Sequence, residues 1–101
     1  MDHDDLAFWS KRAADWARDY HAGLRDRPVR PDLAPGDFRK LIEAPVPESP
    51  TPVEEVFDDF ARLVPDAMTH WQHPRFFAYF PANAAPASML AEQLANAMAG
   101  Q

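Results

Sequence analysis

All eleven prolines of this 101-residue chain lie between Pro28 and Pro86. Proline lacks a backbone hydrogen-bond donor and interrupts helices, so the two proline-free ends are the stretches best able to form helices. Seven of the prolines fall within residues 28–52, and that density favours extended, polyproline-like backbone. The distribution predicts a helix at each end of the chain, with a proline-rich connection between them.

Apolar side chains within the first 27 residues recur every three or four positions, which predicts one long helix with an apolar stripe. The stripe consists of Leu6, Trp9, Ala13, Trp16, Tyr20 and Leu24. Asp2, Asp4 and Asp5 suit the positive end of its dipole, and Gly23 followed by Pro28 predicts where it ends.

Local signals predict further helical segments. Pro35-Gly36 has the chemistry of a type II turn, and we expect a short helical turn over residues 37–42 after it. Thr51-Pro52-Val53-Glu54 resembles a capping box, so a second helix should begin there, and Pro65 should end or kink it. Residues 87–99 form a third helical pattern. Nothing alternates long enough for a strand, and the predicted fold class is all-α.

Composition excludes several classes of function. Sixteen acidic against ten basic side chains give a formal charge of −6, which argues against nucleic-acid binding. The three glycines form no phosphate-binding loop, and without cysteine there is no thiolate metal site. The start Met1-Asp2-His3-Asp4-Asp5 is unlike a signal peptide, and the longest apolar run, residues 76–82, is too short to span a membrane. We expect a soluble, cytoplasmic chain without a membrane partner.

His70 and His73 are the only neighbouring histidines, and they lack the third and fourth ligands of a metal site. We expect two loop histidines that bond to the backbone. The carboxylate pairs Glu54/Glu55 and Asp58/Asp59 should form a solvated helix face.

The stripe on the first helix has too little patterned helix elsewhere in the chain to cover it. We therefore expect it to pack on another chain, and we interpret the sequence as a truncated one. Residues 69–81 add five aromatic rings with neither helical nor strand spacing. Some of these rings should line a pocket, although a hydrophobic plug against a larger domain would show the same composition.

Two elements carry a resemblance to a known family. One is Thr69-His70-Trp71, then Pro74, then the run from Phe76 through Ala78 to Pro81, with Pro86, Met89, Leu90 and Ala91 beyond. The other is Pro31-Asp32-Leu33 with Pro35-Gly36 and Leu41-Ile42. Over nearly its whole length the chain resembles the N-terminal segment of the group II pyridoxal-phosphate-dependent amino-acid decarboxylases.

The resemblance implies a helical flap of three helices with proline-rich connections, on a fold-type I enzyme whose large α/β domain is absent. Residues 1–86 would form the flap and dimerisation segment on a second identical subunit, and residues 87–101 would start the helix leading into the cofactor-binding domain. By the same resemblance, the side-chain pocket for an amino-acid substrate would be bordered by Trp71, Tyr79, Phe80, Pro81 and Ala82. Related animal enzymes commonly carry a hydroxyl residue at position 82. Ala82 cannot bond a ring hydroxyl, which favours an apolar side chain over a catechol.

The resemblance also implies that the longer enzyme to which this segment would belong, here called the parent enzyme, is a carboxy-lyase for aromatic L-amino acids with pyridoxal 5'-phosphate as its cofactor. This chemistry needs a lysine that binds the cofactor and a carboxylate opposite its ring nitrogen. Lys11 and Lys40 are the only lysines here, and neither matches the family's cofactor lysine. We therefore expect no catalytic, cofactor-binding or metal-binding residue in the 101 residues, and no activity from them alone. A non-enzymatic helical interaction module that binds a partner through its aromatic face is the main alternative, and a small ligand-binding helical protein is another.

Overall fold

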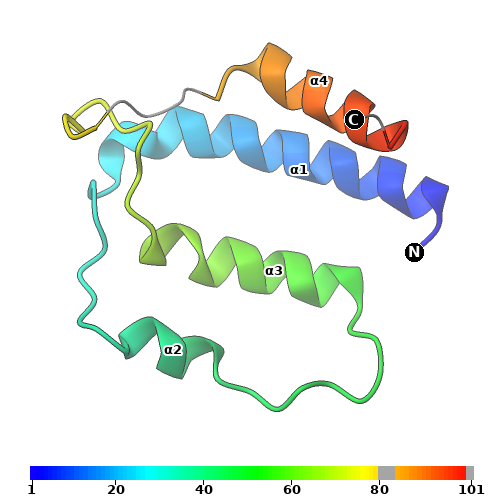
Figure 1. The fold of residues 1–101 in the computed structure, drawn as a ribbon, viewed down its shortest axis with the longest axis horizontal. Helices are drawn as coiled ribbons and strands as arrows, with labels where there is room; N and C mark the ends of the chain where they lie inside the picture. The colour runs from blue at the N-terminus through cyan, green and yellow to red at the C-terminus, as the bar shows by residue number, and fades with distance from the viewer. Residues whose placement is uncertain (80–83, 100–101) are drawn as a thin grey trace.

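The computed structural model describes residues 1–79 and 84–99, and this part of the chain is helical without any strand. The all-α prediction is therefore confirmed. Figure 1 shows how the helices are arranged. In chain order the elements are α1 (His3–Gly23), η1 (Leu24–Asp26), α2 (Asp37–Ile42), α3 (Val53–Leu63), η2 (Pro65–Ala67) and α4 (Pro86–Ala97), where η marks a single 3₁₀ turn.

Helix α1 has the ends that its sequence predicts. The carboxylate of Asp2 accepts from the Asp5 backbone N–H at 2.8 Å, and the carboxylate of Asp5 accepts from the Asp2 N–H at 3.0 Å. This reciprocal pair satisfies two of the donors that a helix leaves without partners at its N-terminus. The α-helical backbone then ends at Gly23 and tightens into η1.

The turn before α2 is also the predicted one. Gly36 has φ +89° and ψ −12°, the values of the second central residue of a type II turn, and the Asp37 N–H donates to the Ala34 carbonyl at 3.1 Å. Helix α2 follows at once over the predicted six residues.

The substitution Gly36→Ala should lower the free energy of unfolding by about 1 kcal/mol, because a Cβ is disfavoured at this positive φ. Chemical denaturation measures the change. Gly23→Ala is the matched control, since a Cβ at either glycine has open space around it and Gly23 has φ −95°. The control should be neutral or slightly stabilising. Equal losses in the two variants would contradict a backbone origin.

Helix α3 corrects one prediction. Its first residue is Val53, so Pro52 occupies the N-cap, and no side chain caps this end. Thr51 lies one position too early for its hydroxyl to accept an amide of the first turn, so the predicted capping box does not form. The other end agrees with the sequence, because α3 stops at Leu63 and Pro65 starts η2.

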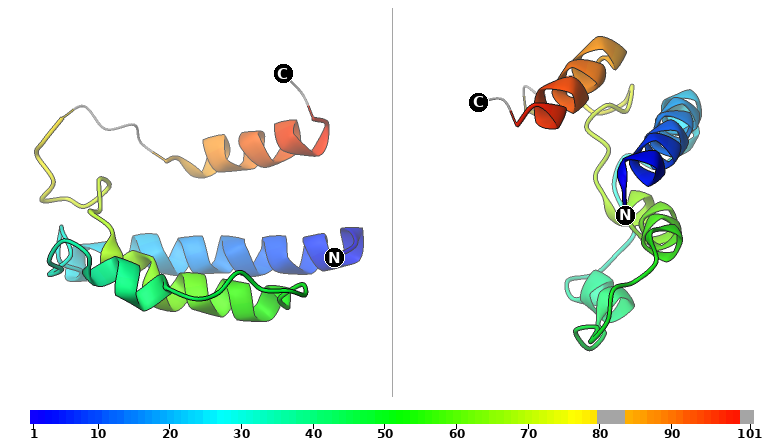
Figure 2. Two further views of the ribbon diagram at one scale, coloured as in Figure 1. Left: turned by 60° about the horizontal axis from the view of Figure 1, so that its bottom comes forward. Right: turned by 90° about the vertical axis from the view of Figure 1, so that its right-hand side faces the viewer.

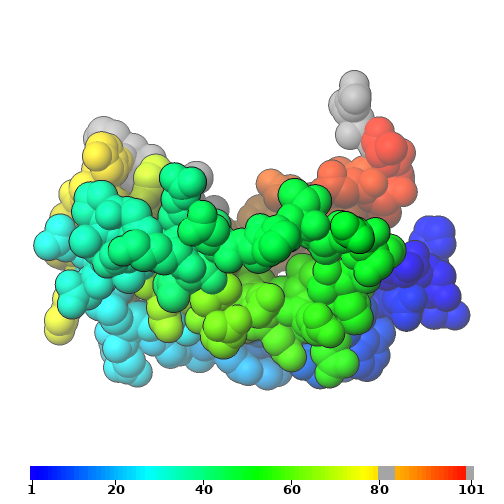
Figure 3. Space-filling view, turned by 90° about the horizontal axis from the view of Figure 1, so that it is seen from below, coloured from blue at the N-terminus to red at the C-terminus, as the bar shows by residue number. Residues whose placement is uncertain are grey.

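The helices form one curved layer rather than a bundle. Figure 1 shows them side by side in the order α4, α1, α3, α2, and the end-on view in Figure 2 shows that the layer bends. In Figure 3 α2 and the proline-rich segment that follows it lie over α3, with α1 behind. Helix α4 is tied to α1 by a hydrogen bond from the Gln93 amide to the Ser10 hydroxyl, at 2.9 Å.

Aromatic rings join α1 to α3. The centroids of Trp9 and Phe57 lie 5.4 Å apart, and those of Trp16 and Phe60 lie 5.1 Å apart. The guanidinium of Arg12 lies 5.6 Å from the Trp9 ring centre and 5.8 Å from that of Phe57. These contacts correct the expectation that the whole α1 stripe packs on another chain, because its two tryptophans face α3 of their own chain.

The layer nevertheless buries few side chains. Its accessible surface is 8745 Å², whereas a compact protein of this mass exposes about 5,800 Å². Its radius of gyration is 15.9 Å, against about 13 Å for a compact chain of this length. Among the described residues, the buried ones are Leu24, Pro65, His70 and His73. The buried centre therefore lies at one end of α1, where η1 meets the segment after η2.

Large apolar side chains remain exposed on α2, α3 and α4. They include Leu41, Ile42, Val56, Leu90 and Leu94, each more than half exposed. No helix in the part of the chain that the structure describes is long and apolar enough to cross a membrane. These side chains leave an extended apolar surface on the layer.

Candidate functional site

The segment after η2 carries the aromatic residues that the sequence singles out. Two successive turns shape it, because the His73 N–H donates to the His70 carbonyl and the Phe76 N–H donates to the His73 carbonyl, each at 3.0 Å. The His70 N–H donates to the Val29 carbonyl at 2.8 Å, across 41 positions of the chain. This bond fixes the start of the segment beside the residues that follow α1.

Three rings of this segment gather into an aromatic cluster, defined here as Trp71, Phe76 and Tyr79. The Trp71 centroid lies 6.0 Å from those of Phe76 and Tyr79, with interplanar angles of 13° and 29°, and the latter two lie 6.4 Å apart. Trp71 is 50 % exposed and Tyr79 is 79 % exposed. Two of the three rings of the cluster are therefore open to contact from outside.

The structure thus brings together two of the five residues predicted to border a pocket, Trp71 and Tyr79. Phe80, Pro81 and Ala82 lie outside the described residues. Phe76, which the sequence-based set omits, completes the cluster. Phe77 is 90 % exposed and joins no ring pair among the described residues.

The two histidines that flank Trp71 are almost fully buried, with exposed fractions of 4 % for His70 and 5 % for His73. The Nε2 atom of His73 lies 2.8 Å from the Arg27 carbonyl, and its Nδ1 lies 3.0 Å from the Arg75 backbone nitrogen. A backbone N–H can only donate, so Nδ1 accepts and the proton of a neutral ring sits on Nε2, which donates to Arg27. For His73, the expected bond to the backbone is confirmed.

His70 differs from that expectation, because its ring bonds to a side chain. The Tyr20 hydroxyl of α1 lies 2.7 Å from His70 Nδ1, and the two ring centres are 5.6 Å apart. Residues 50 positions apart in the chain therefore share a partly buried hydrogen bond. Within the part of the chain that the structure describes, no three His, Cys or carboxylate side chains gather as a metal site would need.

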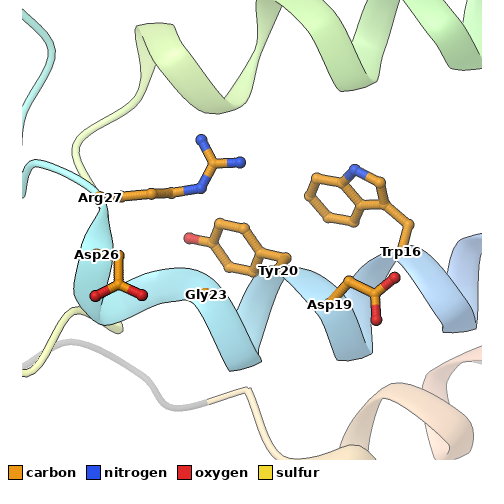
Figure 4. A pocket seen from close by; sticks show the side chains of 6 residues that line it. All are labelled: Trp16, Asp19, Tyr20, Gly23, Asp26 and Arg27. Atoms are coloured by element: carbon orange, nitrogen blue, oxygen red, sulfur yellow. The ribbon is translucent and has the colours of Figure 1, made fainter.

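Figure 4 shows the surroundings of Tyr20. Its ring stacks on Trp16 with centroids 5.2 Å apart and planes at 9°. The Arg27 guanidinium lies 5.8 Å from the ring centre and pairs with Asp66 at 3.1 Å. The hollow beside these groups has a volume of about 350 Å³ and is lined by Trp16, Asp19, Tyr20, Gly23, Asp26 and Arg27.

Burial raises the pKa of the Tyr20 phenol above its usual 10.0, and the positive charge of Arg27 opposes this shift. Because the folded-state pKa is the higher one, the associated stability is present below pH 10.0 and is lost as pH rises through the folded-state pKa. The difference between the phenolate titration curves of the wild type and Tyr20→Phe should therefore have its midpoint above pH 10.0. A midpoint at or below that value would contradict the burial of this ring.

Both lysines of the chain are exposed. Lys11 is exposed and bonds to the Asp15 carboxylate at 3.0 Å, and this hydrogen bond lowers the pKa of Asp15. Lys40 lies exposed on the short helix α2. Lysines that hold pyridoxal phosphate in enzymes lie in enclosed sites. The surroundings of Lys11 and Lys40 do not resemble such a site, and no cofactor chemistry is assigned to these two residues.

Sequence reasoning overlooked Tyr20 and Arg27 as partners of this segment. Tyr20 fits the apolar stripe of α1, and its hydroxyl carries no pattern that reveals a partner 50 residues away. The sequence feature that could have pointed to these partners is the pair His70 and His73, because buried histidines require hydrogen-bond partners.

Comparison with known proteins identifies the family. Residues 35–101 match the model described as the pyridoxal-dependent decarboxylase conserved domain. The chain is 38% identical over 98 residues to the aromatic-L-amino-acid decarboxylase of Mus musculus, covering 97% of this chain and 20% of that protein. It is 35% identical over 94 residues to the phenylacetaldehyde synthase of Arabidopsis thaliana, covering 93% of this chain and 19% of the relative.

A solved structure gives the same result in three dimensions. The crystal structure of Oryza sativa TDC with PLP and tryptamine matches with a TM-score of 0.88 at 30% identity, covering 97% of this chain and 21% of that one. The chain thus spans about a fifth of the length of the proteins it matches. Sequence and fold agree, and the chain belongs to the pyridoxal-dependent decarboxylase family.

Proposed function

We propose that this chain is the N-terminal helical segment of a pyridoxal-phosphate-dependent carboxy-lyase that acts on aromatic L-amino acids. In this proposal it supplies dimer contacts and one wall of the substrate pocket. The observation that carries the proposal is the aromatic cluster, in which Trp71 and Tyr79 are exposed. The histidines on either side of Trp71 are hydrogen-bonded to Tyr20 of α1 and to the Arg27 carbonyl. Flat apolar surfaces of this kind fit the ring of an aromatic side chain.

The exposed surface supports the proposed contacts with a second subunit and with the rest of the enzyme. The layer exposes roughly 3,000 Å² more than a compact protein of its mass. Obligate interfaces bury about 2,000–5,000 Å² in total, so one partner contributes about 1,000–2,500 Å². The excess of this chain is larger than that share, and a second subunit and the rest of the enzyme are the proposed partners. Residues 1–86 would form the flap, and residues 87–101 would lead into the cofactor-binding domain.

Pyridoxal phosphate, when bound, supplies the electron sink that decarboxylation needs. We propose that residues outside this chain hold it. The contribution of the present residues is to bind and orient the substrate side chain through Trp71 and Tyr79, together with Phe80, Pro81 and Ala82. Because Ala82 offers no hydrogen bond, the proposed preference is for rings without hydroxyl groups.

The test is an assay of carbon dioxide and amine release by the protein encoded by the whole reading frame. L-Phenylalanine and L-tryptophan should be decarboxylated in the presence of pyridoxal phosphate. The 101-residue chain, mixed with the same cofactor, dialysed and reduced with borohydride, should retain no chromophore on Lys11 or Lys40. A reading frame that stops after Gln101, together with specific capture of a partner helix, would instead favour the interaction module.

A further inference from the structure

The aromatic cluster is held from outside its own segment. Three hydrogen bonds link residues 70–73 to the C-terminal end of α1 and the residues after it. They join the Tyr20 hydroxyl to His70 Nδ1, the Val29 carbonyl to the His70 N–H, and the Arg27 carbonyl to His73 Nε2, over 2.7 to 2.8 Å. Trp71 lies between the two anchored histidines, so its backbone is fixed on both sides.

From these contacts we infer that Tyr20 and His70 are positioning residues for the substrate pocket: the hydrogen bond between them sets the place of the Trp71 ring. The inference rests on the proposed function. Neither residue has to touch substrate in this role. The hydroxyl belongs to α1, the longest helix of the chain, so the bond transmits the position of a rigid element to a segment made only of turns.

The environment of the pair supports a positioning role. The Tyr20 ring is already held by stacking on Trp16 and by the Arg27 guanidinium, so its hydroxyl points from a fixed ring. His70 is 4 % exposed, so little water is available to replace the lost partner. Loss of the hydroxyl therefore leaves a buried imidazole nitrogen without its partner and lets His70 and Trp71 shift together.

The decisive variant is Tyr20→Phe in the protein encoded by the whole reading frame, because it deletes one oxygen and preserves the stacked ring. We expect KM for L-phenylalanine and L-tryptophan to rise roughly three- to tenfold, with kcat changed less than about twofold. Hydrogen exchange of the peptide spanning residues 69–79 should accelerate in the same preparation. This second readout does not depend on catalysis.

Ser10→Ala is the matched control. It also removes a hydroxyl from α1 that takes part in a hydrogen bond between distant segments, the one with Gln93 of α4, and it leaves residues 70–73 untouched. KM should stay at the wild-type value in this variant. Two substitutions at His70 provide a further comparison. His70→Asn places a polar atom near the former Nδ1 position, so its KM should stay closer to the wild-type value than that of His70→Leu.

The outcomes separate this inference from the proposed function. An active wild type whose Tyr20→Phe variant keeps its KM and its exchange rate would overturn the positioning role and leave the proposed function standing. Equal KM increases in Tyr20→Phe and Ser10→Ala would also overturn it, since they would indicate general loosening of α1. A wild type without decarboxylase activity, whatever the exchange result, contradicts the proposed function instead.

Discussion

Trp16→Ala should lower the free energy of unfolding by about 2–4 kcal/mol, one of the largest effects expected from a single substitution in this chain. The indole is in ring contact with Tyr20 on its own helix and with Phe60 on α3. Deleting it removes one of the two ring contacts between α1 and α3, the other being that of Trp9 with Phe57. Because Trp16 is only half-buried, the expected loss is smaller than that of a fully enclosed tryptophan.

A double-mutant cycle with Phe60→Ala identifies the partner of Trp16. If the two rings stabilise each other within one chain, the coupling energy should be about 0.5–1.5 kcal/mol. Phe8→Ala is the matched control, an aromatic residue on the same helix that is 57 % exposed and faces no ring of α3 among the described residues. It should cost much less stability and show no coupling to Phe60.

Sedimentation distinguishes packing of the tryptophans on α3 from the expectation that the α1 stripe packs on a second subunit. Tryptophans that pack on a second subunit would give a loss of dimer in Trp9→Ala/Trp16→Ala without any coupling to Phe57 or Phe60. The ring contacts of the structure favour coupling within the chain. The dimer surface would then be formed by the apolar residues that remain exposed, Leu6 and Phe8 among them.

The parts of the fold that depend on local chemistry were predictable. Helix ends, the turn at Gly36 and the short helix after it follow from residues within four positions of each other, where proline, glycine and capping side chains act directly. The helix predicted over residues 87–99 is α4, which spans Pro86–Ala97. The error at Thr51 displaced a helix start by one residue. Such a shift is enough to abolish a side-chain cap, because the hydroxyl must stand at one defined position.

The arrangement of the layer was not predictable in the same way. The spacing of Trp9 and Trp16 shows that they share a helix face, but it does not distinguish α3 from another subunit as the partner. The bond between Tyr20 and His70 joins residues 50 positions apart. The aromatic run predicted a pocket or a plug. The choice of Trp71, Phe76 and Tyr79 as neighbours depends on turns at His70 and His73 that no spacing rule specifies.

Trp71→Ala, in the protein encoded by the whole reading frame, should raise KM for L-phenylalanine and L-tryptophan by roughly tenfold or more. The reason is the loss of an aromatic contact, about 1–3 kcal/mol, on the substrate side chain. Trp71 is the central ring of the cluster, at 6.0 Å from both neighbours, and half of its surface is free to meet a ligand. Cofactor binding should be unchanged, because the ring would contact the substrate side chain alone.

A plug between the flap and a larger domain would give a different pattern. Removing Trp71 would then lower the melting temperature and leave the ratio of kcat/KM between aromatic and aliphatic amino acids as it was. Phe77→Ala is the control within the same segment, since Phe77 joins no described ring pair and is 90 % exposed. A pocket role predicts a changed ratio in Trp71→Ala and an unchanged one in Phe77→Ala. The ratio and the melting temperature, measured together on each preparation, decide between recognition of the substrate and packing against the rest of the enzyme.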